Sequence, residues 1–389
     1  MIEKLSAILQ DMHIDAYVGY DFRGSNYNLK NTIGFHSHTT RRWVGIITAS
    51  GTLHLIIPKL EESIFAQIEA EKHIYITHQE FSDALSSLVK DMKVIATDFS
   101  GTNDIPVMDV IPAGFKELLE KSAPQAKIVT SANIAQKIAA TWGEKGYASH
   151  KKAADSMAKI VHAGWDFVRE ARRNKKEITD LDVENFILEQ YKTHHLVVEP
   201  NVCIVSTNQH ASNPHYWPTE ENHFPIKPNS LLLFDVWARS EEVGSIYTDV
   251  TYMAWIGPDE VPAKVKEVWE TVRDARNAGV HFVKENFKKG IQGCQVDDVV
   301  RDVIEKKGYG KYFVHRTGHS IDTNDHGAGT NIDNFETKDT RDIVTDTGFS
   351  IEPGIYLPEF GVRSELDMYI HPDGTAEVTT WKQEELEII

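Results

Sequence analysis

Short apolar runs alternate with amphipathic stretches over about the first 140 residues. The runs rich in β-branched and aromatic residues predict strands at Asp15–Tyr20, Trp43–Thr48, Thr52–Ile57, His73–Thr77 and Lys93–Thr97. Stretches with helical periodicity, such as Lys59–Ala70 and Ser82–Asp91, lie between some of them. We therefore expect a small α/β domain over residues 1–140, without a glycine-rich phosphate loop of specific spacing.

The hydrophobic pattern of the remaining chain, residues 141–389, predicts a second and larger domain that begins with helices. Ala132–Lys151 is expected to be a connecting helix, and an amphipathic helix follows it. The sequence Thr179-Asp180-Leu181-Asp182 resembles a capping box and predicts the start of a further helix. Strands are expected at Cys203–Ser206, Leu231–Val236 and Ile246–Trp255.

This order of two helices followed by strands recurs further along the chain. Apolar residues at helical spacing predict helices around residues 265–282 and 296–304, ahead of strands that hold Glu352 and Glu365. Phe167–Glu170 and Phe282–Glu285 occupy similar places in the two halves. The pattern indicates an internal duplication, although the letters match only weakly.

Composition excludes several classes of function. The 389 residues are 41% apolar and 25% charged, which is typical of a globular protein of two domains. A net charge of −17 argues against a nucleic-acid binder, which needs a basic face. Only Cys203 and Cys294 are present, so a reducing compartment is expected. No secretory leader or membrane-spanning stretch is recognised, and we expect a cytoplasmic protein that binds no membrane.

The most informative residues are four carboxylates and a histidine in segments that otherwise predict buried strands: Asp235, Asp249, His319, Glu352 and Glu365. An isolated ionised carboxylate in such a place is costly unless a cation neutralises it. Taken singly, each has an ordinary explanation as a strand end, a turn residue or a core histidine. As an ordered set of oxygen ligands with one nitrogen they favour a pair of divalent metal ions, Mn²⁺ first, with Co²⁺, Zn²⁺ or Fe²⁺ as alternatives.

Asp235 and Asp249 are expected on the two arms of a hairpin, since Gly244 between them can adopt the positive φ that such a turn often needs. Glu352 and Glu365 are expected on another pair of strands, joined through Pro353-Gly354 and the segment 358–361. If the two halves pack face to face, the four carboxylates converge.

The motifs around these residues resemble the M24 metallopeptidase family, which has the pita-bread fold and includes methionine aminopeptidase, aminopeptidase P, prolidase and creatinase. They are His315-Arg316-Thr317-Gly318-His319 with His326, Ile351-Glu352-Pro353-Gly354, Gly361-Val362-Arg363-Ser364-Glu365 and Asn213-Pro214-His215-Tyr216. The first 140 residues resemble, more loosely, the creatinase-type domain of the Xaa-Pro branch. The resemblance implies an α/β fold, a homodimer, and hydrolysis of short peptides with proline in the second position.

The resemblance also implies a role for each site residue. Asp235 and Asp249 would hold one metal, His319 and Glu352 the second, with Asp249 and Glu365 as bridges. Two adjacent metals lower the pKa of a shared water, and Glu352 is our choice for passing its proton to the leaving nitrogen.

Further side chains are assigned around the metals. His326 and His215 would donate to the carbonyl oxygen of the substrate. Arg363 would support a ligand carboxylate or bind a substrate carboxylate, and His315 is as readily structural as substrate-binding. His36, His38, Arg41 and Arg42 form a basic patch that is either solvated surface or a cap on a catalytic cleft.

Three departures from the family pattern concern the substrate side: Trp237, Asp322 and Gly327, the last in place of a common acid after His326. They leave open a second enzyme class, which acts on a small non-peptide metabolite. A non-catalytic binding module is disfavoured because all five ligand positions are intact. The native metal, the residue preferred before proline, and the choice between dipeptidase and aminopeptidase are not determined by the sequence.

Overall fold

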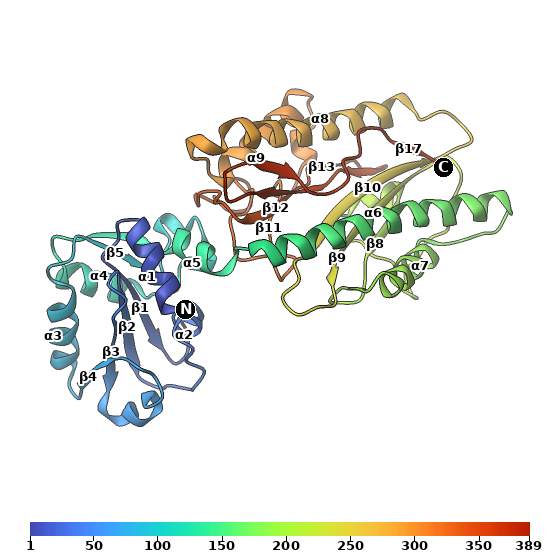
Figure 1. The fold of residues 1–389 in the computed structure, drawn as a ribbon. Coiled ribbons are helices and arrows are strands. Elements are labelled where there is room, and N and C mark those ends of the chain that lie inside the picture. The colour runs from blue at the N-terminus through green and yellow to red at the C-terminus, as the bar shows by residue number, and fades with distance from the viewer. The chain divides into compact units, whose positions relative to one another are not determined.

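A computed structural model describes residues 1–389, which form two compact units, Met1–Ala139 and Ala140–Ile389 (Figure 1). The first unit contains one sheet of six strands in the order β4-β3-β2-β1-β5-β6. β1 and β2 pair antiparallel, as do β2 and β3, whereas β4, β5 and β6 join in parallel. Its strands are β1 (Ala16–Phe22), β2 (Arg42–Thr48), β3 (Leu53–Pro58), β4 (Glu71–Tyr75), β5 (Val94–Thr97) and β6 (Lys127–Thr130). Its helices are α1 (Ile2–Asp11), α2 (Tyr27–Thr32), α3 (His78–Val89), α4 (Ala113–Ser122) and α5 (Ala132–Ala139).

All five strands predicted in this unit are present, with ends shifted by up to two residues. β6 was missed because four residues with little burial carry a weak pattern. The helix predicted from Lys59 is a 3-10 helix, η1 (Lys59–Phe65). The continuous helix predicted over Ala132–Lys151 is wrong: the chain breaks after α5 and resumes at Gly143, whose φ of +66° is a left-handed conformation.

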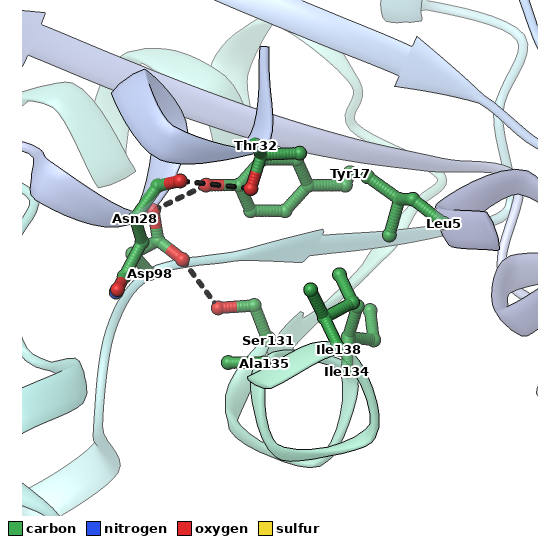
Figure 2. A pocket seen from close by; sticks show the side chains of 9 residues that line it. All are labelled: Leu5, Tyr17, Asn28, Thr32, Asp98, Ser131, Ile134, Ala135 and Ile138. Carbon is green, nitrogen blue, oxygen red and sulfur yellow. Dashed lines mark hydrogen bonds between the residues drawn. The ribbon is translucent and has the colours of Figure 1, made fainter. Parts of the chain in front are cut away.

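A buried carboxylate ties the centre of this unit together. Asp98 accepts hydrogen bonds from Tyr17 at 2.6 Å and Ser131 at 2.5 Å (Figure 2). It also accepts one from Asn26 at 2.7 Å. Its donors come from β1, the turn before α2, and the start of α5, so the bonds connect segments that are far apart in sequence. The carboxylate is fully supplied with donors, which is what burial of a polar group requires.

The second unit contains four long helices, α6 (Gly143–Arg173), α7 (Asp180–Thr193), α8 (Ala263–Asn286) and α9 (Gly293–Lys306). The capping box predicted at Thr179 is present, with Thr179 and Asp182 bonding each other's backbone N–H. The strands are β7 (Leu196–Val197), β8 (Ile204–Thr207), β9 (Ser230–Ser240), β10 (Thr248–Ile256), β11 (Ser320–Ile321), β12 (Thr347–Ile351), β13 (Gly354–Tyr356), β14 (Gly361–Arg363), β15 (Leu366–Ile370), β16 (Ala376–Val378) and β17 (Glu387–Ile388). The order of two helices then strands occurs twice, as expected.

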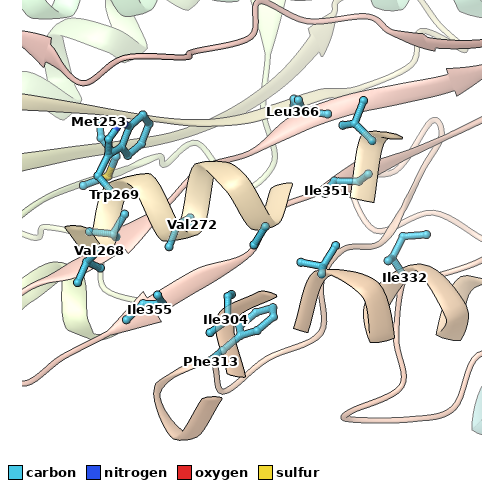
Figure 3. Packing of buried hydrophobic residues seen from close by; sticks show 14 of the residues in the cluster. Met253, Val268, Trp269, Val272, Ile304, Phe313, Ile332, Ile351, Ile355 and Leu366 are labelled. Carbon is cyan, nitrogen blue, oxygen red and sulfur yellow. The ribbon is translucent and has the colours of Figure 1, made fainter. Parts of the chain in front are cut away.

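The hairpin of β9 and β10 lies between two hydrophobic cores. Leu231, Leu233 and Met253 face a core built with α8, α9 and the strands β12 to β15 (Figure 3). Leu232 and Phe234 face the other core, which is built with α6 and α7. A strand covered on both faces explains the nearly continuous apolar sequence of this hairpin. None of the helices is long and apolar enough to cross a membrane.

Candidate metal centre

Asp235 and Asp249 continue the apolar row that β9 and β10 present to the core of α8 and α9. The register pairs Asp235 with Thr251 and Trp237 with Asp249, so these four side chains share one face of the antiparallel hairpin. Gly244 in the connecting turn has a φ of +82°, as predicted. The face of the hairpin that is apolar along most of its length is therefore acidic at the end near the turn.

Glu352 and Glu365 lie at breaks between strands, where the sequence predicted them within strands. Glu352 follows β12 and precedes Pro353, while Glu365 separates β14 from β15. The two breaks face each other, because β12 pairs with β15 and β13 pairs with β14. Pro353 has no N–H to continue the ladder, which gives a physical reason for the interruption.

His319 stands directly before β11 and is 3% exposed. Its backbone N–H donates to Ser350 Oγ at 3.0 Å, and its Nδ1 lies 3.2 Å from the Ser320 carbonyl oxygen. A carbonyl only accepts, so Nδ1 carries the ring proton and Nε2 presents a lone pair. Nε2 lies 3.4 Å from Asp249 Oδ2 and 3.5 Å from Glu352 Oε1. The imidazole is therefore oriented as a neutral ligand.

The residues fit a bound cation. Asp249 Oδ1 and Glu365 Oε1 are buried carboxylate oxygens with no hydrogen-bond partner. Ligand atoms of Asp249, His319 and Glu365 lie within 4.8 Å of one another. Burial, followed by the charges of neighbouring carboxylates, raises the pKa of Asp249 and of Glu365 well above the usual range. Such a concentration of buried negative charge needs positive ions to offset it.

Arg363 supports the acidic cluster from the side of β14. Its guanidinium donates to Asp235 Oδ2, to Thr251 Oγ1 at 3.0 Å and to the Tyr356 hydroxyl at 3.0 Å. Thr251 in turn donates to Glu365 Oε2 at 2.9 Å. One arginine therefore fixes Asp235 directly and Glu365 through Thr251. Arg363 is 4% exposed, and each of its three nitrogens donates a hydrogen bond to a side chain.

His326 lies against His319, with ring centroids 4.1 Å apart. Arg316 Nη2 lies 3.3 Å from His326 Nδ1, which must accept because a guanidinium has no lone pair to offer. Repulsion between this ring and His319 if both were protonated, together with burial and Arg316, lowers the pKa of His326 to about 3. His326 is thus neutral, with its proton on Nε2. His215 is exposed and near enough for its charge to act on His326.

His315 stands apart from the ligands. Its Nδ1 lies 2.6 Å from the Arg316 carbonyl oxygen, and its Nε2 lies 2.7 Å from the Tyr356 hydroxyl. Nδ1 must donate, so Nε2 accepts from Tyr356, the same hydroxyl that receives Arg363. Burial, with a further contribution from Arg363, lowers its pKa to about 3. Both nitrogens are used inside the protein, where they brace the tyrosine behind Arg363.

Asp325 is a further carboxylate at this place, which sequence reasoning missed. Its Oδ1 is buried without a partner, and its carboxylate groups with His319 and His326 within 4.8 Å. Burial raises its pKa to about 7. The sequence did contain a signal for this residue. Family members commonly have an acid directly after the histidine, whereas this chain has Gly327 there and Asp325 directly before His326. Asp322, by contrast, accepts from Asn324 and Ala328 within its own loop.

The remaining predicted residues are placed as follows. Trp237 is partly buried beside the acidic face of the hairpin. The basic patch lies after α2, with His36, His38 and Arg41 exposed in the connecting loop and Arg42 at the start of β2.

A model of the metallopeptidase family M24 matches residues 114–372, which include the end of the first unit and most of the second. The chain belongs to metallopeptidase family M24. Among curated relatives of this M24 chain, the Xaa-Pro dipeptidase of Lactobacillus helveticus is 37% identical over 174 residues, covering 44% of the chain and 42% of the relative. That of Lactobacillus delbrueckii subsp. lactis is 34% identical over 210 residues, covering 53% and 51%. The M24 chain thus matches about half the length of these relatives.

Solved structures extend the likeness to both units of the M24 chain. A prolidase from Thermococcus sibiricus superposes with a TM-score of 0.56 at 23% identity, covering 100% of this chain and 98% of that one. The dipeptidase PepE from Mycobacterium ulcerans gives 0.62 at 20% identity, covering 100% and 96%. These likenesses show the fold: an N-terminal α/β sheet domain followed by a pita-bread domain, as the sequence predicted. Membership of M24 also implies divalent metal ions.

Proposed function

We propose that this M24 protein hydrolyses the peptide bond before proline in short peptides, using two divalent metal ions held by Asp235, Asp249, His319, Glu352 and Glu365. The observation that carries the proposal is the convergence of four carboxylates and one oriented imidazole, with two buried carboxylate oxygens left without partners. The Lactobacillus relatives, which are Xaa-Pro dipeptidases, supply the substrate class. When bound, the metal pair supplies a water of lowered pKa and polarises the scissile carbonyl.

The chain's own residues orient and move protons around that chemistry. Glu352 receives a proton and passes it to the leaving nitrogen, because burial raises the pKa of its carboxyl and so favours the protonated form. His326 donates from Nε2 to the carbonyl oxygen as charge develops there, since Arg316 occupies Nδ1. His215 would add a second donor from the exposed side. Arg363, with His315 and Tyr356 behind it, keeps Asp235 in position.

Four finer assignments belong to the same proposal. Mn²⁺ is the ion favoured by an oxygen-rich donor set with a single nitrogen. A homodimer and two domain roles, a creatinase-like N-terminal domain over residues 1–140 and a catalytic domain over 141–389, follow from the Xaa-Pro branch. The two cysteines are free and buried, which fits the cytoplasm as the compartment.

The test is hydrolysis of Xaa-Pro dipeptides and Xaa-Pro-Xaa tripeptides by metal-stripped protein reloaded with Mn²⁺, Co²⁺ or Zn²⁺. Glu352→Gln is compared with Glu359→Gln, an exposed neighbour on the loop between β13 and β14. We expect metal-dependent cleavage that Glu352→Gln lowers by at least about 100-fold and that Glu359→Gln leaves unchanged. The ratio of dipeptide to tripeptide cleavage assigns the branch. Two bound metals without cleavage of either class would contradict the substrate assignment and favour a small non-peptide metabolite.

A further inference from the structure

A second group of side chains that could hold a metal lies in the N-terminal unit and includes none of the residues assigned to the metal centre. His54 is on β3, and Glu71 and His73 are on β4, the edge strand of the six-stranded sheet. The parallel register pairs His54 with Glu71 and Ile56 with His73. Because His54 and Ile56 are two positions apart, all three polar side chains share one face of the sheet. The M24 resemblance gives this group no role.

The distances match the edges of a metal coordination polyhedron. His54 Nδ1 lies 3.1 Å from Glu71 Oε2 and 3.4 Å from His73 Nε2. All three ligand atoms lie within 4.8 Å of one another. Nitrogen and oxygen ligands bind Zn²⁺ at about 2.0–2.2 Å in tetrahedral geometry, which separates two ligand atoms by about 3.3–3.5 Å. The two imidazole rings are tilted by 43°, so their nitrogens approach without stacking.

Hydrogen bonding satisfies this arrangement poorly. His54 Nδ1 carries at most one proton, and contact with the Glu71 carboxylate uses it. His73 Nε2 can then only share that proton as a second acceptor, so the two short contacts have one proton between them. A cation takes a lone pair from each of the three atoms and satisfies them together. Burial and the neighbouring His54 lower the pKa of His73, which favours the neutral form that binds metal.

We propose that His54, Glu71 and His73 form a binding site for a single divalent transition-metal ion of the Zn²⁺ class. Two imidazoles and one carboxylate are the donor set that such ions favour. The side chain of His54 is 16% exposed, that of Glu71 is 65% exposed, and His73 is partly exposed. The fourth position of the ion is therefore open to water. A bound ion joins the edge strand β4 to β3 across one face of the sheet. The site is independent of the proposed peptidase activity.

The experiment titrates metal-stripped, full-length protein with Zn²⁺ against a chromophoric chelator and locates the ions by anomalous scattering from Zn²⁺-soaked crystals. We expect an ion within bonding distance of His54 Nδ1, and one fewer Zn²⁺ per chain in His73→Ala than in the wild type. The control is His78→Ala, an exposed histidine at the start of α3, which should match the wild type. Asp249→Asn, which removes a proposed ligand of the other centre, should keep this ion.

Glu71→Gln guards against misfolding of the histidine variant, since the Glu71 side chain is 65% exposed and its replacement leaves the core intact. We expect it to weaken Zn²⁺ binding at this site by about tenfold or more. Equal Zn²⁺ stoichiometry and affinity in the wild type, His73→Ala and Glu71→Gln would overturn the proposal. So would anomalous peaks confined to the centre around Asp249 and His319.

Discussion

The guanidinium of Arg363 donates a hydrogen bond to the carboxylate of Asp235, a residue 128 positions earlier in the chain. This contact joins the end of β14 to the β9–β10 hairpin. It therefore connects the segment that carries Glu365 to the hairpin that carries Asp235 and Asp249. Tyr356 and Thr251 accept from the other donors of the same guanidinium, so its direction is fixed. The acidic cluster is thus held together partly by a buried cation of the protein itself.

Replacing Arg363 should weaken metal binding although all five proposed ligands remain in place. We expect Arg363→Met to lower metal affinity by about 10–100-fold, because Asp235 and, through Thr251, Glu365 lose their orientation. Arg363→Lys should recover only part of the loss, since an ammonium cannot reproduce three donors in a planar fork. Isothermal titration of the stripped variants with Mn²⁺ measures the effect. Arg169→Met, a partly exposed arginine on α6, is the matched control, and equal affinities for it and Arg363→Met would contradict the prediction.

Gly318→Ala should destabilise the protein and displace His319. A Cβ at position 318 would lie 2.1 Å from the Ser350 carbonyl oxygen, which is backbone and cannot rotate away. The overlap forces β12 and the loop of His319 apart, at a cost of about 1–3 kcal/mol or more. Chemical unfolding of the stripped protein measures the change. Gly114→Ala in α4 is the control: no atom lies within 4 Å of its Cβ, so it should leave stability unchanged or raise it.

Asp325→Asn should stabilise the metal-free protein above neutral pH. The folded state raises the pKa of Asp325 to about 7, chiefly through burial, whereas an unfolded aspartate titrates near about 3.9. The wild type therefore loses stability as pH rises from about 4 through about 7, where the folded carboxyl gives up its proton. The variant lacks that loss, so its advantage should be about 1.5 kcal/mol at pH 5 and about 4 kcal/mol at pH 8.

Urea unfolding in the presence of a chelator at both pH values tests this prediction. Asp155→Asn, an exposed residue on α6, serves as the control and should change stability by only a few tenths of a kcal/mol. A stability difference between Asp325→Asn and the wild type that stays constant with pH would show that the charge of Asp325 is not the cause.

His150 should make the second unit sensitive to acid. It is fully buried on α6, with Nδ1 2.6 Å from the Tyr247 carbonyl oxygen and Nε2 2.7 Å from Thr379 Oγ1. Burial lowers its pKa to about 4, against about 6.5 when unfolded. Its contribution to stability is therefore complete above pH 6.5 and is lost as pH falls towards 4, on the order of 3 kcal/mol in all.

His150→Gln removes this titration while keeping a side chain that can donate and accept. The variant should be less stable at pH 7 but should lose less stability than the wild type between pH 6.5 and pH 4. The control is His162→Gln. His162 is on the same helix as His150 and its ring packs against Trp165 and Trp381, and the variant should keep the wild-type pH dependence. Parallel pH profiles for the wild type and His150→Gln would refute the assignment.

Local sequence determined several features of this protein. The nearly continuous apolar runs of residues 231–236 and 246–255 predict two strands joined at a turn, with Asp235 and Asp249 on its two arms. The capping box at Thr179 and the positive φ at Gly244 also depend on neighbouring residues alone. The motifs around His319, Glu352 and Glu365 indicated the family, since each is a short run of specific residues.

Only the tertiary structure decided what depends on distant partners. It places Glu352 and Glu365 at breaks that face each other, joins Arg363 to Asp235, uses both nitrogens of His315 internally, and brings Asp325 to the metal centre. It also breaks the helix predicted across residues 132–151. Local periodicity carries information about which face a side chain occupies, whereas a buried charge takes its role from whichever side chains folding packs against it.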